Sequence, residues 1–212
     1  MLHRIHLEDT VIDPRTEDWE AYYRATAGRN PSPWFIEAVD YIDANHGQGR
    51  LAVDLGCGNG VESKALLDRG WRVLAIDSEP SAIELTRARA AGDEADRLTT
   101  LVSRFAGVDL PEVDLVFAQL SLPFCPVEVF DGLWQQIRGA IRPGGHFVGQ
   151  FLGPDDDWAA ACLVHSIDDV ENLATGWEIE LLREQRHEGV GGARRDPKFW
   201  HLISLIARRP ED

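Results

Sequence analysis

The chain has 212 residues, of which 44% are hydrophobic and 27% are charged, and its formal net charge is −15. This length and composition are typical of one soluble globular domain with a full core. The acidic charge disfavours nucleic acid as a partner, because such a field repels a phosphate backbone. We find no apolar signal-peptide core and no run near the roughly 20 apolar residues of a membrane span. We therefore expect a cytoplasmic protein, monomeric or homodimeric, with no membrane partner.

The cysteines are few and widely separated: Cys57, Cys125 and Cys162, with no C-x-x-C pair. This spacing suits a reducing compartment and argues against a disulfide framework or a zinc site. We expect no bound metal, and we interpret each cysteine as a small apolar core residue.

Two helices are predicted before the first core strand, over residues 17–27 and 32–44, after an irregular polar segment at 1–15. Aromatic residues are dense here: Trp19, Tyr22, Tyr23 and Trp34. We divide the chain into an N-terminal helical segment, 1–45, and a core domain, 46–212. The aromatic residues either form a lid over a ligand or pack the two helices onto the sheet, and the sequence leaves both open.

The core domain begins with a predicted strand at 51–55 that runs directly into a glycine loop. Asp54 is near the end of this strand, and Gly56, Gly58 and Gly60 follow at alternate positions. Glycines let a backbone turn tightly and approach a ligand closely, because no Cβ blocks it. The next predicted strand, 72–77, ends in Asp77, whose carboxylate can accept hydrogen bonds from both hydroxyls of a ribose. The pattern predicts a nucleoside site.

The spacing of the glycines argues against two common nucleotide-binding motifs. A dinucleotide fingerprint, G-x-G-x-x-G, would place its third glycine at Val61, and no G-x-x-x-x-G-K-[ST] phosphate loop is present. The alternative interpretation is a tight glycine turn of the kind found in any α/β protein.

The following segments alternate between helix and strand. We predict helices at 60–69, 80–91 and 127–140, and strands at 98–102, 113–118 and 145–151. Ser78 stands where the N-cap of the second of these helices is expected, and Pro143-Gly144-Gly145 is read as a stop and turn before the fifth strand. Strands alternating with helices predict a parallel sheet covered on both faces.

The last third departs from this alternation. Ser166 and Asp169 fit a capping box for a helix to about residue 174. Strands are predicted at 177–181 and 199–207, joined by a long hairpin turn through Gly189, Gly191 and Gly192. The final strand is apolar on both faces, so we expect it to lie antiparallel beside the fifth strand, with the sixth at the edge.

The glycine loop and Asp77 resemble motif I and the ribose-binding acid of the class I S-adenosylmethionine-dependent methyltransferases. The expected strand order also matches the 3-2-1-4-5-7-6 sheet of that family, a Rossmann-like α/β domain. The resemblance extends from about Trp19 to Arg208. Further segments are similar to the small stand-alone bacterial branch of tellurite-resistance type: Trp19-x-x-Tyr22-Tyr23, Ala25–Arg29, Ser121–Cys125, Leu133-Trp134, Arg142–Gly145 and Pro197–His201.

The resemblance implies a cofactor site for S-adenosylmethionine, with S-adenosylhomocysteine as product. The residues it assigns to the cofactor are Asp54, Gly56, Gly58, Asp77, Ser78, Phe105 and Gln119. Phe105 is either a ring that stacks on adenine or a core residue, because this chain lacks the acid that family members often carry after strand three. The residues assigned to the methyl acceptor are Tyr22, Tyr23, Pro123, Phe124 and His201.

Methyl transfer needs alignment and exclusion of water more than acid–base chemistry, so we assign no obligatory catalytic residue. His165 and His201 are each either a proton acceptor or a hydrogen-bonded structural histidine. Asp155–Asp157 is either a site for a cationic acceptor or metal, or a solvated loop. Ser121-Leu-Pro-Phe124 has serine and leucine where the [DN]-P-P-[YF] motif has Asp or Asn and the first proline; together with the acidic net charge, this disfavours a DNA adenine methyltransferase.

We therefore predict methyl transfer from S-adenosylmethionine to a small-molecule acceptor. One alternative is a non-catalytic regulatory or scaffold protein that binds S-adenosylmethionine. A second is transfer of another group, such as aminopropyl, from the same cofactor, for which Asp155–Asp157 would have to bind a polyamine.

Overall fold

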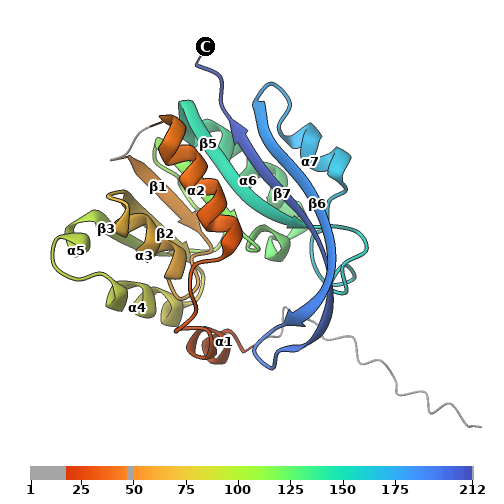
Figure 1. Ribbon diagram of the computed structural model, residues 1–212, viewed down its shortest axis with the longest axis horizontal. Helices are drawn as coiled ribbons and strands as arrows, with labels where there is room; N and C mark the ends of the chain where they lie inside the picture. Colours follow the sequence, from red (N-terminus) through yellow and green to blue (C-terminus); the bar gives the residue numbers. More distant parts are fainter. Residues whose placement is uncertain (1–17, 47–49, 212) are drawn as a thin grey trace, which may run out of the picture.

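The computed structural model describes residues 18–46 and 50–211 (Figure 1), so the irregular segment predicted at 1–15 lies outside the described residues. In chain order the elements are α1 (Trp19–Ala25), α2 (Pro33–His46), β1 (Leu51–Leu55), α3 (Val61–Asp68), β2 (Arg72–Asp77), α4 (Pro80–Arg89), α5 (Asp93–Arg97), β3 (Leu98–Val102), β4 (Val113–Gln119), the 3-10 turn η2 (Leu122–Phe124), α6 (Val127–Ala140), β5 (Ile141–Leu152), α7 (Ile167–Leu173), β6 (Glu178–Gly191) and β7 (Asp196–Arg208).

The strands form one seven-stranded sheet in the order β3-β2-β1-β4-β5-β7-β6, which confirms the predicted topology. The first five strands pair in parallel, and β7 pairs antiparallel with both β5 and β6. The reversal of β7 follows from the hairpin, because a short connection can join only antiparallel neighbours.

Two apolar cores lie on the two faces of this sheet. On one face α2 and α3 pack on strand residues such as Ala52, Leu115 and Phe117. On the other face α6 and α7 pack on Val53, Val116 and their neighbours. The alternation of side chains along β1 and β4 divides the strand residues between the two cores. The sheet is thus the middle layer of three.

The carboxyl ends of the parallel strands all lie at one edge of the molecule. In Figure 1 this is the lower edge, where α1 and the turn of the β6–β7 hairpin also lie, whereas the C-terminus is at the top. Ligands of open α/β sheets bind beyond the carboxyl ends of the strands, so this edge is where a site is expected.

Two turn predictions are wrong. Pro143-Gly144-Gly145 does not stop the chain before β5: these residues lie inside β5, at a bulge where the pairing with β4 shifts register between Val113 and Leu115. The hairpin turn is also shorter than predicted, since β6 continues through Gly189 to Gly191. Ring and chain atoms of Trp200, Trp158 and Lys198 lie where a Cβ at these two glycines would be.

Candidate functional site

The glycine loop after β1 is held in a left-handed conformation, with φ of +81° at Gly56, +53° at Gly58 and +73° at Gly60. A Cβ at Gly56 would lie 2.2 Å from Cβ of Ser121, and one at Gly60 would lie 2.8 Å from Cα of Thr86. These two glycines are therefore required by packing inside the protein. Gly58 differs, because the three atoms nearest to its missing Cβ all belong to the side-chain ring of Tyr23, the nearest at 3.1 Å.

Asp77 at the end of β2 reaches this loop directly. Its Oδ2 accepts a hydrogen bond from the backbone N–H of Gly58 at 2.8 Å, and its Oδ1 accepts one from the N–H of Glu79 at 3.0 Å. The side chain is buried, and this burial raises the pKa of Asp77, an effect that the backbone donors oppose. The two features singled out in the sequence thus form one structural unit.

Asp54 lies beneath the same loop. Its carboxylate accepts a hydrogen bond from Oγ of Ser63 on α3 at 2.6 Å and is buried. Burial raises the pKa of Asp54 to about 7, and the neighbouring acids Glu62 and Asp77 add to this effect. The geometry makes Asp54 an anchor between β1 and α3.

The aromatic helix α1 lies against the loop. The ring of Tyr23 covers Gly58, and a hydrogen bond from this side chain is among the effects that lower the pKa of Asp77. Nδ2 of Asn59 donates to the carbonyl oxygen of Tyr23 at 2.9 Å and to Oγ1 of Thr26 at 3.0 Å, which fixes the end of α1 to the loop. Tyr23, which we predicted at the acceptor, therefore contacts two residues predicted to bind the cofactor.

A second connection to the N-terminal segment was not predicted. The guanidinium of Arg29 makes two hydrogen bonds, of 2.6 and 2.5 Å, to the carboxylate of Glu62 at the start of α3. Oγ of Ser32 donates to Oε1 of Gln119 at 2.7 Å, so Gln119 at the end of β4 is tied to the start of α2. The signal for this region in the sequence was the similarity of the Ala25–Arg29 segment to the tellurite-resistance-type branch, which did not indicate these contacts.

The chain makes a strained turn after Gln119. Leu120 has a φ of +53°, which is uncommon for a residue with a side chain. Ser121 then donates from Oγ to the carbonyl oxygen of Leu55 at 2.5 Å and packs on Gly56. Such strain persists where surrounding contacts fix it, and it is found preferentially at functional sites.

The two residues assigned to the adenine lie at the ends of neighbouring strands. Ser78 is exposed and is not an N-cap, because α4 is capped by Glu79 with Pro80 in its first turn. The predicted cap is wrong by one residue. Phe105 is partly buried and packs against the core on the α6 face of the sheet. This position agrees with the interpretation of Phe105 as a core residue.

On the acceptor side the structure joins residues that are distant in sequence. Pro123 is buried in η2, and the neighbouring ring of Phe124 contacts Trp19 of α1, with 5.0 Å between ring centroids. Phe124 also contacts Trp158 in the loop after β5, at 6.3 Å. Sequence reasoning did not single out Trp158, since an isolated tryptophan in a polar loop carries no periodic signal.

His201 is held on both sides of its ring. Its Nδ1 accepts a hydrogen bond from the N–H of Asp155 at 3.1 Å, and its Nε2 lies 2.9 Å from Oε1 of Glu184. The side chain is buried. This geometry is that of a structural histidine. His165 packs between the rings of Phe130 and Phe151, where burial lowers its pKa.

The side chains of Asp155–Asp157 all form ion pairs or hydrogen bonds with residues of the β6–β7 hairpin. Asp155 pairs with Arg186 at 3.1 Å, Asp156 pairs with the buried Lys198, and Asp157 accepts from the N–H of Phe199 at 2.6 Å. The described residues contain no group of three or more potential ligands arranged to hold a metal. The geometry therefore does not support the alternative in which Asp155–Asp157 bind a polyamine, because these carboxylates already have partners within the protein.

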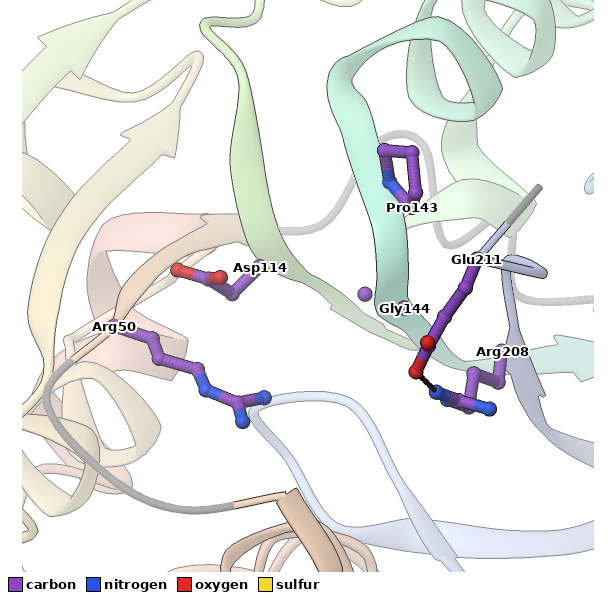
Figure 2. A pocket seen from close by; sticks show the side chains of 7 residues that line it. Arg50, Asp114, Pro143, Gly144, Arg208 and Glu211 are labelled. Atoms are coloured by element: carbon purple, nitrogen blue, oxygen red, sulfur yellow. Dashed lines mark hydrogen bonds and ion pairs between the residues drawn. The ribbon is translucent and has the colours of Figure 1, made fainter.

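A cavity of about 260 Å³ lies at the opposite, amino-terminal end of the parallel strands (Figure 2). Arg50, Asp114 and Arg208 line it together with Pro143-Gly144-Gly145 and Glu211. Asp114 pairs with Arg142 at 3.1 Å, and Arg208 pairs with Glu178 and Glu211. The cavity does not contact the glycine loop.

Comparison with known proteins identifies related domains. Residues 52–145 match the family model described as a methyltransferase domain. A protein named as a probable ribosomal RNA small subunit methyltransferase A from Methanospirillum hungatei is 37% identical over 83 residues, which are 39% of this chain and 31% of that protein. The 2-heptyl-1-hydroxyquinolin-4(1H)-one methyltransferase of Mycobacteroides abscessus is 28% identical over 141 residues, 61% of each chain. This chain thus spans less than two thirds of both relatives.

Solved structures share the fold. TehB from Haemophilus influenzae superposes with a TM-score of 0.69 at 16% identity, covering 82% of this chain and 61% of TehB. The 1,6-didemethyltoxoflavin-N1-methyltransferase of Burkholderia thailandensis, solved with 1,6-didemethyltoxoflavin and S-adenosylhomocysteine, gives 0.66 at 18% identity, covering 99% and 92%. Among the described residues, no helix is long and apolar enough to cross a membrane.

Proposed function

We propose that this chain, which belongs to the class I S-adenosylmethionine-dependent methyltransferases, transfers a methyl group from that cofactor to a small organic molecule. The observation that carries the proposal is the hydrogen bond from the N–H of Gly58 to Asp77. It brings the glycine loop and the β2 carboxylate together within the matched region, at the carboxyl ends of the parallel strands, where ligands of open α/β sheets bind.

The residues at this edge fit the cofactor. Gly58 presents a backbone face without a Cβ, and Asp77 offers carboxylate oxygens for the two ribose hydroxyls. Gly56 lets the turn at Ser121 approach the loop, and Asp54 anchors the loop through Ser63. In this proposal Ser78 and Phe105 border the adenine, and Gln119 faces the methionine part of the cofactor.

Tyr23 supports the proposal that α1 is a lid. Its ring covers Gly58 and its hydroxyl is among the groups that lower the pKa of Asp77, so the side chain lies in the space that the cofactor needs. The side chain must therefore move when the cofactor binds. The tyrosines and Trp19 of α1 would then help to exclude water from the reacting groups.

When bound, S-adenosylmethionine supplies an electrophilic methyl group on a positively charged sulfur. This chain's residues hold the acceptor in line with that group and keep water away. An anionic oxygen, nitrogen or sulfur acceptor needs no proton transfer, and a neutral one releases its proton to water. Because both ring nitrogens of His201 are occupied, we assign no side chain as general base.

The choice of a small-molecule acceptor rests on charge and on the better-covered relative. A net charge of −15 opposes binding of ribosomal RNA, whereas the relative that matches over 61% of both chains is named for a small quinolone. Other relatives are named for ribosomal RNA or for ribosomal protein L11, so these must be tested as competing acceptors.

The test is a transfer assay with S-adenosylmethionine labelled in its methyl group. The acceptor panel contains small phenols, thiols, amines and hydroxyquinolones beside ribosomal RNA and protein L11, and mass spectrometry identifies the labelled product. We expect a labelled small molecule and equimolar S-adenosylhomocysteine. Labelled RNA or L11 alone would contradict the proposal. Cofactor binding without turnover on any acceptor would favour a regulatory or scaffold protein.

A further inference from the structure

We propose that Trp19, Tyr22, Phe124, Trp158 and Trp200 form the binding surface for the methyl acceptor, and that this acceptor is a planar aromatic molecule without positive charge. We call these five side chains the aromatic surface. The inference rests on the proposed function, because it names the substrate class of the same site.

The aromatic surface continues from the cofactor loop without a break. Tyr23, which covers Gly58, stacks on Trp19 with 6.0 Å between ring centroids. From Trp19 the contacts continue to Phe124 at 5.0 Å, then to Trp158 at 6.3 Å. Trp158 in turn contacts Trp200 at 5.4 Å. A ligand on these rings would therefore lie beside the residues proposed to hold the cofactor.

These rings are not part of the buried core. All five side chains are partly exposed, whereas the core rings of Phe147 and Phe151 are no more than 1% exposed. They also come from four separate parts of the chain: α1, η2, the loop after β5, and β7. A contiguous, partly exposed aromatic surface beside a polar site is typical of a ligand-binding wall.

The geometry of the rings favours a flat ligand. Trp19 and Phe124 meet at 87°, and Trp158 and Trp200 meet at 63°. Such corners let a planar ring stack on one side chain while it meets the edge of the next, the two arrangements that aromatic pairs prefer. A saturated ring of the same size presents no flat face for either contact.

The two tryptophans nearest the hairpin are rigidly placed. The ring of Trp200 lies 3.0 Å from the Cβ position of Gly189 and donates from Nε1 to the carbonyl oxygen of Val190 at 3.2 Å. The ring of Trp158 lies 2.9 Å from the Cβ position of Gly191. The two hairpin glycines therefore explain how these rings can pack so close to the strand backbone, and the wall is organised before a ligand binds.

The charge beside these rings argues against a cationic acceptor. Nζ of Lys198 lies 3.8 Å from the ring centroid of Trp200 and 4.6 Å from that of Trp158, and its ion pair with Asp156 is buried. An aromatic cage of this kind is where a protein would hold an ammonium ligand. Here the chain's own ammonium occupies the cage, so this position is not available to a second cation.

The experiment compares three probes in the presence of S-adenosylhomocysteine: 2-naphthol, its saturated counterpart decahydro-2-naphthol, and the cation spermidine. Binding is measured by calorimetry and by quenching of tryptophan fluorescence. We expect 2-naphthol to bind about tenfold more tightly than decahydro-2-naphthol, the order of one stacking contact, and spermidine not to bind at the aromatic surface. Equal binding of the two naphthols, or displacement of 2-naphthol by spermidine, would overturn the inference.

Substitutions test whether 2-naphthol binds at the aromatic surface. Trp158→Leu removes one wall, and Trp177→Leu is the matched control, because Trp177 is also partly exposed but lies under Arg138 away from the site. We expect Trp158→Leu to weaken 2-naphthol binding about tenfold and Trp177→Leu to leave it unchanged. Equal effects of the two variants would overturn the inference.

The same titrations separate this inference from the proposed function. Binding of S-adenosylhomocysteine is measured for each variant, and we expect it to be unchanged in both. If the wild-type protein binds S-adenosylhomocysteine but not 2-naphthol, the acceptor class is wrong and the family function stands. If S-adenosylhomocysteine itself does not bind, the proposed function fails.

Discussion

Each end of the sheet buries a carboxylate to a similar degree, but the two are satisfied in different ways. At the carboxyl end Asp77 is 7% exposed, and at the amino end Asp114 is 8% exposed. Asp114 accepts from the N–H of Leu51 at 2.8 Å and pairs with Arg142 at 3.1 Å. Asp77 accepts from the backbone N–H groups of Gly58 and Glu79, and its burial raises its pKa.

The difference separates stability from ligand binding. A carboxylate paired with a cation and a strand N–H holds the fold together. A carboxylate held by loop N–H groups in a strained glycine turn is organised for another partner. The amino-terminal cavity in Figure 2 is thus lined by side chains such as Asp114 and Arg208 whose charges pair with their neighbours, as expected of a structural feature. The carboxyl end is where substitutions should change binding.

The largest effect is expected from Gly58→Val at the carboxyl end. The new side chain would occupy the face on which the cofactor must lie, so binding of S-adenosylhomocysteine should fall below detection. Gly70→Val is the control, because Gly70 has a similar positive φ, +84°, but open space around its Cβ position. Calorimetry should show near-normal binding for Gly70→Val. Equal loss in both variants would mean that backbone strain, not blockage, is responsible.

Asp54→Asn should change how stability depends on pH. The native pKa of Asp54, about 7, lies above the unfolded value, so the native state binds more protons between about pH 4 and pH 7. This acid therefore makes the wild type less stable as the pH rises through that window, by at most about 4 kcal/mol. An asparagine side chain keeps an oxygen that can accept the hydrogen bond from Ser63, but it has no carboxyl group to ionise as the pH rises.

Denaturant unfolding at pH 5 and pH 8 measures the effect. The free energy of unfolding of Asp54→Asn, relative to wild type, should increase between these pH values. Asp109→Asn, at an exposed acid, is the control. A relative stability of Asp54→Asn that does not change with pH would show that Asp54 is already ionised at pH 5.

At the amino end, Asp114→Ala should reduce stability and leave cofactor binding unchanged. It leaves the N–H of Leu51 without its acceptor and Arg142 without its partner, at a cost of about 1–3 kcal/mol. Thermal unfolding and a titration with S-adenosylhomocysteine measure the two quantities. A weaker affinity in this variant would break the proposed division between the two ends.

The smallest effect is expected from Tyr23→Phe. Loss of the hydroxyl removes an interaction with Asp77 that the cofactor must replace, so S-adenosylhomocysteine should bind about two- to tenfold more tightly. Tyr22→Phe on the same helix is the control. Weaker binding in Tyr23→Phe would mean that this hydroxyl contacts the bound cofactor and does not compete with it.

The fold could be predicted well because its signals are local. The limits of β2, β3 and α6 match those predicted from hydrophobic periodicity and from glycine and proline positions. The capping box at Ser166 is also confirmed. The error in the length of the hairpin turn arises at glycines whose role is packing: Gly189 and Gly191 indicated a turn, but they make room for Trp200 and Trp158.

The candidate site was predicted only in part. The loop and Asp77 carry a spacing signal, so their contact could be anticipated. The pairing of Arg29 with Glu62 and the position of Trp158 depend on how distant elements meet, for which one sequence holds no pattern. The place of Tyr23 over Gly58 is a tertiary contact of the same kind.

The central claim is most directly tested by titrating S-adenosylhomocysteine into the wild-type protein and into Asp77→Ala, with Asp114→Ala as the control. The account predicts that wild type and Asp114→Ala bind alike, and that Asp77→Ala loses two charge-assisted hydrogen bonds, about 2–4 kcal/mol of binding free energy. Unchanged affinity in a folded Asp77→Ala protein would contradict it, because the cofactor would then lie elsewhere.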